Sequence, residues 1–213
     1  MSPLLSVIIV NWNVRELLRA CLQSVLRASA GTALEIIVVD SASSDGSVAM
    51  LRADFPAVRV IACDQNVGFS AGNNRGIAAA RGEYLLCLNP DTEIFGNALG
   101  ILMTFLQANP TVGVAGPRLL YPDGTTQPSR RRFPNLATAF LESTILQQWF
   151  PHNHVLDRYY MTDQPDSVTQ DVDWLMGACF MLRCAVVAQV GAFDEGFFMY
   201  SEEADLCRRL RGA

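Results

Sequence analysis

Short apolar runs alternate with helix-like stretches through the first part of this chain. Four runs of five residues each are rich in Val, Ile and Leu: residues 6–10, 35–39, 58–62 and 84–88. Between them, apolar residues recur at helical spacing over residues 14–28, 47–53 and 69–80. Apolar strands that are joined by helices belong to a parallel sheet covered on both faces. We therefore predict an α/β fold.

Asn or Asp stands near the carboxyl end of each of these predicted strands. The four ends read Asn11-Trp12-Asn13, Asp40-Ser41, Asp64-Gln65-Asn66 and Asn89-Pro90-Asp91. Each residue alone also suits a turn. Because ligands of parallel sheets bind beyond the carboxyl ends of the strands, the four ends together predict a polar pocket along one edge of the sheet.

The second half of the chain is less regular. Helical spacing recurs over residues 97–106, near 136–149 and over 202–211, and extended segments are expected at 112–115, 118–121 and 172–182. Most of the stretch 128–170 is rich in Pro, Arg and polar residues, so we predict loop there. The last helix reaches the end of the chain in the middle of its pattern, and we expect a C-terminally truncated domain.

Composition narrows the class of protein. The chain has 213 residues, 50% of them hydrophobic, which is enough for one large domain. A net charge of -5 argues against a general nucleic-acid binder. The six cysteines form no CxxC pair and there are only two histidines, which favours reduced core thiols over a zinc site. The most membrane-like stretch, residues 174–193, contains Arg183 and Gln189 and fits a strand followed by a short helix better than a span.

The motifs for nucleotide binding are partial. Neither GxGxxG nor GxxxxGK[ST] occurs, so a dinucleotide or P-loop site loses its main support. Asp40 could still bind a base or a ribose, or it could cap a turn. In the loop over residues 66–77, Gly68 and Gly72 allow close backbone approach, and the helix that follows would favour a diphosphate at its N-terminus. Ordinary loop glycines are the alternative.

Two clusters of acidic residues and one run of arginines are further candidates for functional sites. Asp91 with Asn89 and Glu93 forms a set of hard oxygen ligands that suits Mg²⁺ or Mn²⁺ on a diphosphate. Glu202 and Glu203 begin the last predicted helix, where they either favour the helix dipole or supply a general base. The run Arg130-Arg131-Arg132 is either a solvated face or a site for acceptor phosphates.

Five segments in order resemble glycosyltransferase family 2, particularly its rhamnosyltransferase-like branch. They are SVIIVNWN, VVDSASSDGS, NVGFSAGNNRGI, LLCLNPDTEI and GAFDEGFFMYSEEADLCRRL, and together they extend from Ser6 to Leu210. The resemblance implies a GT-A fold with a Rossmann-like, mostly parallel central sheet flanked by helices. It also implies that residues 1–95 form the nucleotide-sugar-binding half and residues 96–213 the acceptor-binding half of one domain.

The resemblance also implies roles for individual residues. Nucleotide-sugar binding falls to Asn11, Asn13, Asp40, Asn66, Gly68, Asn74, Asn89 and Asp91. Asp91 would bind the metal, Glu203 or Glu202 would be the catalytic base, and acceptor binding falls to Trp174, Gly177, Arg130 and Arg131. The sequence departs from the family pattern at Asn89, where an acid is usual, at Asn73, where many relatives carry Arg, and at Glu203, where Asp is usual.

The function implied is that of an inverting glycosyltransferase in cell-surface polysaccharide synthesis. We expect the donor to be dTDP-rhamnose or a UDP-sugar, the cofactor Mg²⁺ or Mn²⁺, and the acceptor a glycan or a polyprenyl-linked sugar. Nucleic acid is not an expected partner. We expect a cytoplasmic protein, and the sequence leaves open peripheral attachment to the inner face of the plasma membrane and assembly into a homo-oligomer.

Two alternatives stand beside this function. The chain could be a catalytically weak, truncated module that only binds the donor. It could also be a sugar nucleotidyltransferase, although such an enzyme would need a Gly-rich, Lys-bearing loop near the N-terminus, and the sequence has no Lys.

Overall fold

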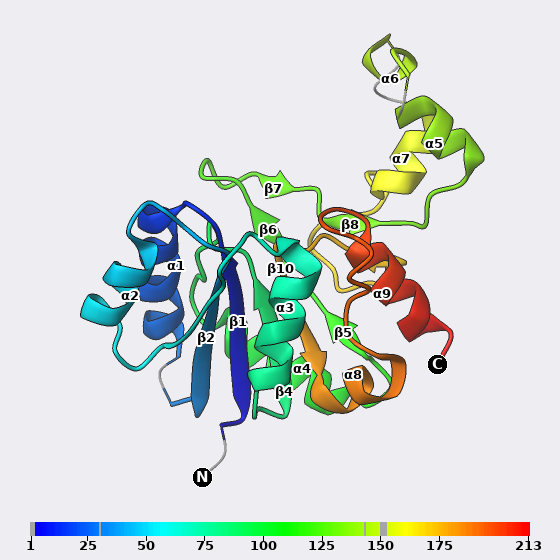
Figure 1. The fold of residues 1–213 in the computed structure, drawn as a ribbon. Helices are drawn as coiled ribbons and strands as arrows, with labels where there is room; N and C mark the ends of the chain where they lie inside the picture. The colour runs from blue at the N-terminus through cyan, green and yellow to red at the C-terminus, as the bar shows by residue number, and fades with distance from the viewer. Residues whose placement is uncertain (1–2, 30, 143, 150–152) are drawn as a thin grey trace. The chain divides into compact units, whose positions relative to one another are not determined.

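The computed structural model describes residues 3–29, 31–142, 144–149 and 153–213. The chain divides into two compact units (Figure 1). The larger unit comprises Met1–Pro117 with Gly177–Ala213, and the smaller unit comprises Arg118–Met176. These boundaries describe packing, and the division into donor and acceptor halves at residue 95 stays a prediction.

A six-stranded sheet with the order β3-β2-β1-β4-β10-β5 forms the centre of the larger unit. Its strands are β1 (Leu5–Asn11), β2 (Leu34–Asp40), β3 (Arg59–Ala62), β4 (Tyr84–Leu88), β5 (Val114–Ala115) and β10 (Cys179–Arg183). The strands β1, β2, β3 and β4 are all parallel to one another. Strand β10 is antiparallel to both of its neighbours, β4 and β5. The prediction of a mostly parallel sheet is confirmed.

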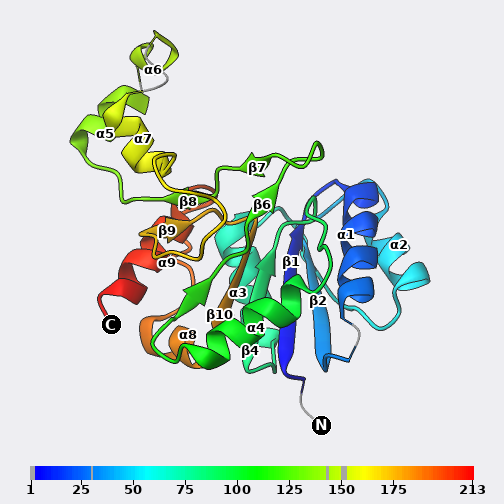
Figure 2. The same cartoon turned by 180° about the vertical axis from the view of Figure 1, so that it is seen from behind.

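Helices cover both faces of this sheet. The helices of the larger unit are α1 (Arg15–Ala28), α2 (Ser47–Asp54), α3 (Gly68–Ala79), α4 (Ala98–Ala108), α8 (Cys184–Val190) and α9 (Glu202–Arg211). Helix α3 lies over one face, in front in Figure 1, and α4 lies over the other, in front in Figure 2. Helix α1 illustrates why they pack, since its buried Leu18, Cys21, Leu22 and Val25 recur at helical spacing on one side.

The core of the larger unit fills the space between the sheet and its helices. Val7, Ile8 and Ile9 of β1 are completely buried, as a central strand covered on both faces requires. Five of the six cysteines are buried, all six are free thiols, and Cys184 is exposed. The expectation of reduced thiols in the core is therefore met at five positions.

The described residues of the smaller unit form two short antiparallel pairs and three helices. The strands are β6 (Leu119–Leu120), β7 (Thr126–Gln127), β8 (Arg130–Arg131) and β9 (Trp174–Leu175), and the helices are α5 (Leu136–Glu142), α6 (Leu146–Trp149) and α7 (His154–Tyr160). The single helix predicted near 136–149 is thus two helices, with residue 143 outside the described part of the chain.

Helix α7 corrects the prediction that residues 128–170 are mostly loop outside that one helix. Its start depends on Asn153, whose side-chain oxygen accepts hydrogen bonds from the backbone N–H groups of Val155 and Leu156. The stretch 174–193, considered above as a membrane span, forms two strands, β9 and β10, followed by the short helix α8, where one strand and a short helix were predicted. Among the described residues, every helix is too short or too polar to traverse a bilayer.

Candidate functional site

The ends of β1 and β2 carry a preformed polar network. Asn11 and Asp40 are register partners, and both are buried. The Asn11 Nδ2 donates to Asp40 Oδ2 at 2.8 Å and to Ser43 Oγ at 3.1 Å, and Asp40 Oδ1 accepts from the Ser43 N–H at 2.9 Å. Among the described residues the Asn11 Oδ1 has no partner, which leaves a buried acceptor at this edge for a ligand.

Asn13 extends this network toward solvent. Its backbone has a φ of 55°, and its Oδ1 accepts from the Ser44 N–H at 2.7 Å while its own N–H donates to Ser43 Oγ at 3.0 Å. These bonds join the loop after β1 to the loop after β2. Asn13 therefore has a structural role here, and its contact with a donor stays a prediction.

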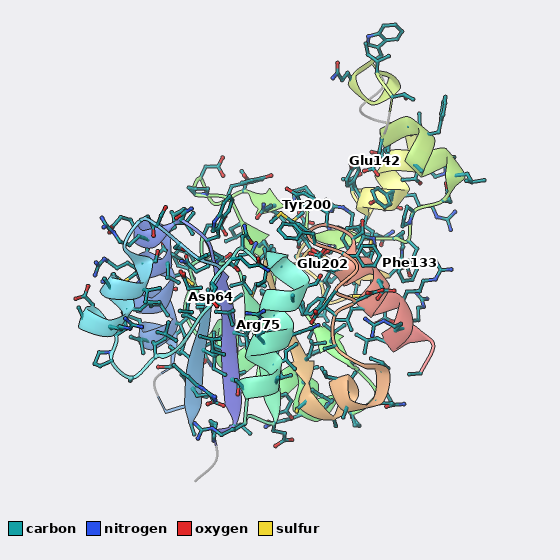
Figure 3. The ribbon with its side chains drawn as sticks, viewed as in Figure 1. Asp64, Arg75, Phe133, Glu142, Tyr200 and Glu202 are labelled. Atoms are coloured by element: carbon teal, nitrogen blue, oxygen red, sulfur yellow. The ribbon has the colours of Figure 1, made fainter. Side chains whose placement is uncertain are left out.

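The loop after β3 leads into α3. The Asn66 Oδ1 accepts from the Gly68 N–H at 3.0 Å, which forms a tight turn at the start of the helix. Gly68 has a φ of 78°, a conformation that favours glycine. Asp64 and Arg75 lie on this loop and on α3 (Figure 3), and both are exposed. The side chain of Asn74 bonds to residues 193 and 195 of the same unit.

The turn after β4 presents Asp91. The Asn89 carbonyl accepts from the Thr92 N–H at 3.2 Å, so the turn expected from Asn-Pro-Asp is present. The Asp91 side chain is exposed and has no hydrogen bond or ion pair with any described residue. Glu93 lies 3.8 Å from the Arg27 guanidinium, and both side chains are exposed.

The fit of a divalent cation rests on this turn. In the part of the chain that the structure describes, no group of three or more His, Cys, Asp or Glu residues could hold a metal ion by themselves. Mg²⁺ often takes only one or two protein carboxylates and completes its shell with phosphate oxygens and water. The unpaired carboxylate of Asp91 fits a cation that arrives with a diphosphate.

The pair Glu202–Glu203 opens helix α9, and Glu202 is labelled there in Figure 3. Glu202 is 2% exposed, and its Oε2 has no partner among the described residues. Burial, with a smaller contribution from the neighbouring charge of Glu203, raises the pKa of Glu202 to about 7. Burial also raises the pKa of Glu203. Both carboxyl groups are thus shifted toward the range in which a general base works at neutral pH.

Residues 177 and 178, just before β10, connect this pair to the turn that carries Asp91. The Gly177 N–H donates to Glu203 Oε1 at 2.8 Å, and the Ala178 carbonyl accepts from the Asn89 N–H at 2.9 Å. A Cβ on residue 177 would lie 2.5 Å from Glu203 Oε1, so the carboxylate occupies the space of a side chain. The structure therefore brings Asn89, Gly177 and Glu203 together.

Ala178 is the residue that the sequence did not indicate. It contributes only its backbone carbonyl, which accepts the hydrogen bond from Asn89, and a residue of any type could supply that carbonyl. No side-chain pattern could have revealed it.

The predicted acceptor residues of the smaller unit are bonded inside that unit. The Arg130 guanidinium pairs with Asp166 and with the carbonyl of Pro165. Arg131 is buried, and its guanidinium lies 4.5 Å from the ring centre of Tyr160 and 6.0 Å from that of Trp174. Trp174 Nε1 donates to the Arg132 carbonyl at 2.9 Å. Acceptor binding by these three residues stays a prediction, and phosphates would have to compete with these partners.

Comparison with known proteins gives a consistent result. Residues 6–191 match the sequence profile of the family described as Glycosyl transferase family 2. An N-acetylglucosaminyl-diphospho-decaprenol L-rhamnosyltransferase of Mycobacterium tuberculosis is 28% identical over 99% of this chain and 71% of its own length. The low-salt glycan biosynthesis hexosyltransferase Agl10 of Haloferax volcanii is 30% identical over 97% of this chain and 61% of its own length.

Two solved structures share the fold. The mannosyltransferase PcManGT of Pyrobaculum calidifontis, in complex with GDP-Man and Mn²⁺, matches with a TM-score of 0.63 at 18% identity. Residues 1–349 of TarS from S. aureus match with a TM-score of 0.63 at 16% identity. The matches cover 97% and 99% of this chain but only 51% and 55% of those two chains.

Proposed function

We propose that this chain, which belongs to glycosyl transferase family 2 and has a GT-A fold, transfers a sugar from a nucleoside diphosphate donor to an acceptor hydroxyl with inversion. By their names, its relatives include an L-rhamnosyltransferase that acts on N-acetylglucosaminyl-diphospho-decaprenol and a succinoglycan biosynthesis protein, which supports a role for this chain in cell-surface polysaccharide synthesis. By this likeness dTDP-rhamnose is the first candidate donor and a UDP-sugar the second. The acceptor is a glycan or a polyprenyl-linked sugar.

One observation carries the proposal. Residues 177 and 178 bond both to Glu203 and to Asn89, so a carboxylate with a raised pKa is tied to the turn that carries the exposed carboxylate of Asp91. The same short backbone segment thus positions a base and an acid that can bind a diphosphate. This arrangement suits displacement of the diphosphate at a sugar carbon.

The chemistry divides among the residues as follows. The buried Asn11–Asp40 network supplies fixed hydrogen-bonding groups for the base and ribose of the donor. A divalent cation held by Asp91 would neutralise charge on the leaving diphosphate. Glu203 accepts the proton of the acceptor hydroxyl, whose oxygen attacks the anomeric carbon from the face opposite the diphosphate. Glu202 is the alternative base.

Exposed apolar side chains on the smaller unit support a lipid-linked acceptor. Leu136 and Phe140 on α5, and Ile145 and Trp149 at α6, are all exposed, Leu136 by 91%. Large exposed apolar groups on one segment are a feature of sites that meet apolar partners. Substituting Phe140 and Trp149 by Ser is expected to slow transfer to a long polyprenyl acceptor and to spare a short, water-soluble one.

A direct assay tests the proposed reaction. The chain is incubated with dTDP-rhamnose or a UDP-sugar, Mg²⁺ or Mn²⁺, and a polyprenyl diphosphate N-acetylglucosamine acceptor. We expect release of the nucleoside diphosphate and a glycoside whose anomeric configuration, read by NMR, is opposite to that of the donor. Donor binding without transfer would favour a module that only binds the donor, and pyrophosphate release from a nucleoside triphosphate and a sugar phosphate would favour the nucleotidyltransferase.

Substitution of Asp91 tests the metal site separately. Asp91→Ala is expected to abolish the part of donor affinity that depends on Mg²⁺ or Mn²⁺, because no second described carboxylate is free at this turn. Calorimetry with and without the cation measures this part. Asp123→Ala, which removes an exposed carboxylate from a turn in the smaller unit, is the control. Undiminished metal-dependent binding by Asp91→Ala would refute the metal role.

A further inference from the structure

Residues 193–198 form a strap that is bonded to helix α3 at both of its ends. The strap connects α8 to the segment before α9, and it lies 119 or more residues from its partner Asn74 in the sequence. It begins at the buried Phe193, whose ring packs edge-on against Phe69 of α3 and Phe180 of β10. The strap is therefore part of the packed larger unit.

Asn74 makes the bonds at the first end of the strap. Its Nδ2 donates to the Phe193 carbonyl and to Glu195 Oε1, both at 2.9 Å, and its Oδ1 accepts from the Phe193 N–H at 3.0 Å. The amide thus pairs with both backbone groups of Phe193, as a neighbouring strand would do. Since its Nδ2 and Oδ1 both bond to the strap, Asn74 has little hydrogen-bonding capacity left for a donor sugar.

The N-terminus of α3 holds the second end. The Phe69 N–H donates to the Phe198 carbonyl at 2.8 Å. At Gly68 a Cβ would lie 2.5 Å from that same carbonyl oxygen, so the close approach depends on a residue without a side chain. Two separate points on α3 therefore fix the path of the strap.

The strap leads within four residues to the acid pair. Tyr200 and Ser201 follow with φ angles of 73° and 74°, the left-handed conformation that is strained for residues other than glycine. Such a turn persists only where its surroundings hold it. Directly after it, Glu202 is buried and Glu203 bonds to Gly177. Figure 3 labels Tyr200 and Glu202 at this point.

We propose that Asn74 is a positioning residue, which holds the strap on α3 so that the strained turn at 200–201 places Glu202 and Glu203 for catalysis. This replaces the role of donor ligand that the resemblance gave to Asn74. The inference rests on the proposed function for the catalytic role of the acid pair. The physical link from Asn74 to the acid pair is independent of that function.

The test compares Asn74→Ala with a matched control, Asn109→Ala. Asn109 also lies in the larger unit, and its Nδ2 donates to the Phe105 carbonyl at 2.8 Å within its own helix end. We expect Asn74→Ala to lower kcat about 10- to 100-fold with donor Kd, from calorimetry, changed by no more than about twofold. Asn109→Ala is expected to leave both values within about twofold of the starting protein.

A charge-swapped pair tests the contact itself. Asn74→Asp places a carboxylate against Glu195 and loses the donor to Phe193, so it is expected to be worse than Asn74→Ala. Adding Glu195→Gln restores a donor–acceptor pair between the two side chains, and part of the lost kcat should return. A double variant no better than Asn74→Asp would contradict the role assigned to this contact.

Hydrogen exchange separates this inference from the proposed function. In Asn74→Ala, amides of residues 193–206 should exchange at least about tenfold faster than in Asn109→Ala, whether or not transfer is detected. Unchanged protection there would overturn the inference. A tenfold loss of donor affinity with kcat preserved would also overturn it, because Asn74 would then be a donor ligand, while the proposed function would stand.

Discussion

Asp40 and Glu202 are two buried carboxylates of the same unit, and their surroundings differ. Asp40 is 1% exposed and accepts hydrogen bonds from the Asn11 side chain and the Ser43 backbone. Glu202 is 2% exposed, yet its Oε2 has no partner among the described residues and its pKa is raised to about 7. Equal burial has thus produced one bonded carboxylate and one that is short of partners.

The difference indicates a division of labour. A carboxylate that accepts hydrogen bonds from fixed groups is held in one orientation, which suits recognition of a base or ribose. A buried carboxyl group without such donors keeps its proton to higher pH, which suits proton transfer. On this view the ends of β1 and β2, with Asn11 and Asp40, form a binding region for the donor. The start of α9, with Glu202 and Glu203, forms a reactive region that transfers the proton.

The largest expected effect comes from the reactive region. Glu203→Gln keeps an oxygen that can accept a hydrogen bond from the Gly177 N–H, but the amide cannot act as a base toward the acceptor hydroxyl. We expect transfer to fall about 10²- to 10⁴-fold, the usual contribution of a general base, with donor Kd nearly unchanged. Single-turnover kinetics and calorimetry measure the two quantities.

Glu202→Gln is the comparison variant for this experiment. If Glu203 is the base, Glu202→Gln retains more activity than Glu203→Gln. The reverse order would assign the base to Glu202, and normal transfer by both variants would place the base outside the acid pair.

Gly177→Ala is expected to have the next largest effect. The added methyl would lie 2.5 Å from Glu203 Oε1 and must displace the carboxylate from its bond. We expect a loss of roughly tenfold or more in kcat, since small displacements of a catalytic group are costly. Gly31→Ala is unsuitable as a control because its φ is positive, whereas Gly113→Ala meets only side chains at 3.5 Å and should be mild.

The sequence predicted the binding region better than the reactive one. Apolar runs and helical spacing are local signals, so β1 to β4 and α1 to α3 lie within about two residues of their predicted positions. Parallel strands bring their carboxyl ends to one edge, and the pairing of Asn11 with Asp40 follows from that topology. For this region, strand order was nearly all the information required.

The contacts around the acid pair depend on the tertiary fold. The bond from Gly177 to Glu203 joins residues 26 apart through a backbone N–H, and Asn74 reaches Phe193 across 119 residues. Neither contact leaves a periodic or compositional trace. Helix α7 was missed for a related reason, because its capping residue Asn153 lies in a stretch whose composition favours loop.

The dependence of stability on pH tests the description of Glu202. Its folded-state pKa of about 7 exceeds the ordinary value of 4.5, so the folded protein binds more protons than the unfolded chain between these values. Stability therefore falls as pH rises through this window and levels off above about 7. Glu202→Gln removes this dependence.

Denaturation by urea at pH 5.5 and pH 8 measures the effect. The free energy of unfolding of Glu202→Gln, relative to that of the starting protein, should be higher at pH 8 than at pH 5.5 by on the order of 1–2 kcal/mol. Glu83→Gln, at an exposed position, serves as the control and should show no such change. Equal pH dependence in Glu202→Gln and the starting protein would show that Glu202 does not titrate in this range.

The smallest expected effect lies in the binding region, where the network provides redundancy. Ser43→Ala removes a hydroxyl oxygen that accepts from Asn11 Nδ2 at 3.1 Å and from the Asn13 N–H at 3.0 Å, but the Asn11–Asp40 bond and the Ser43 N–H bond to Asp40 remain. We expect a cost of about 1 kcal/mol in stability and a loss of a few-fold in donor affinity, with kcat unchanged. Ser44→Ala, which removes only a 3.3 Å bond to Asn13 at an exposed position, should cost less. Ser43→Ala could instead lower kcat and leave donor affinity unchanged. A change confined to the β1–β2 network would then have acted on the chemical step. In that case the assignment of donor binding to this edge, and of catalysis to the acid pair, would be wrong.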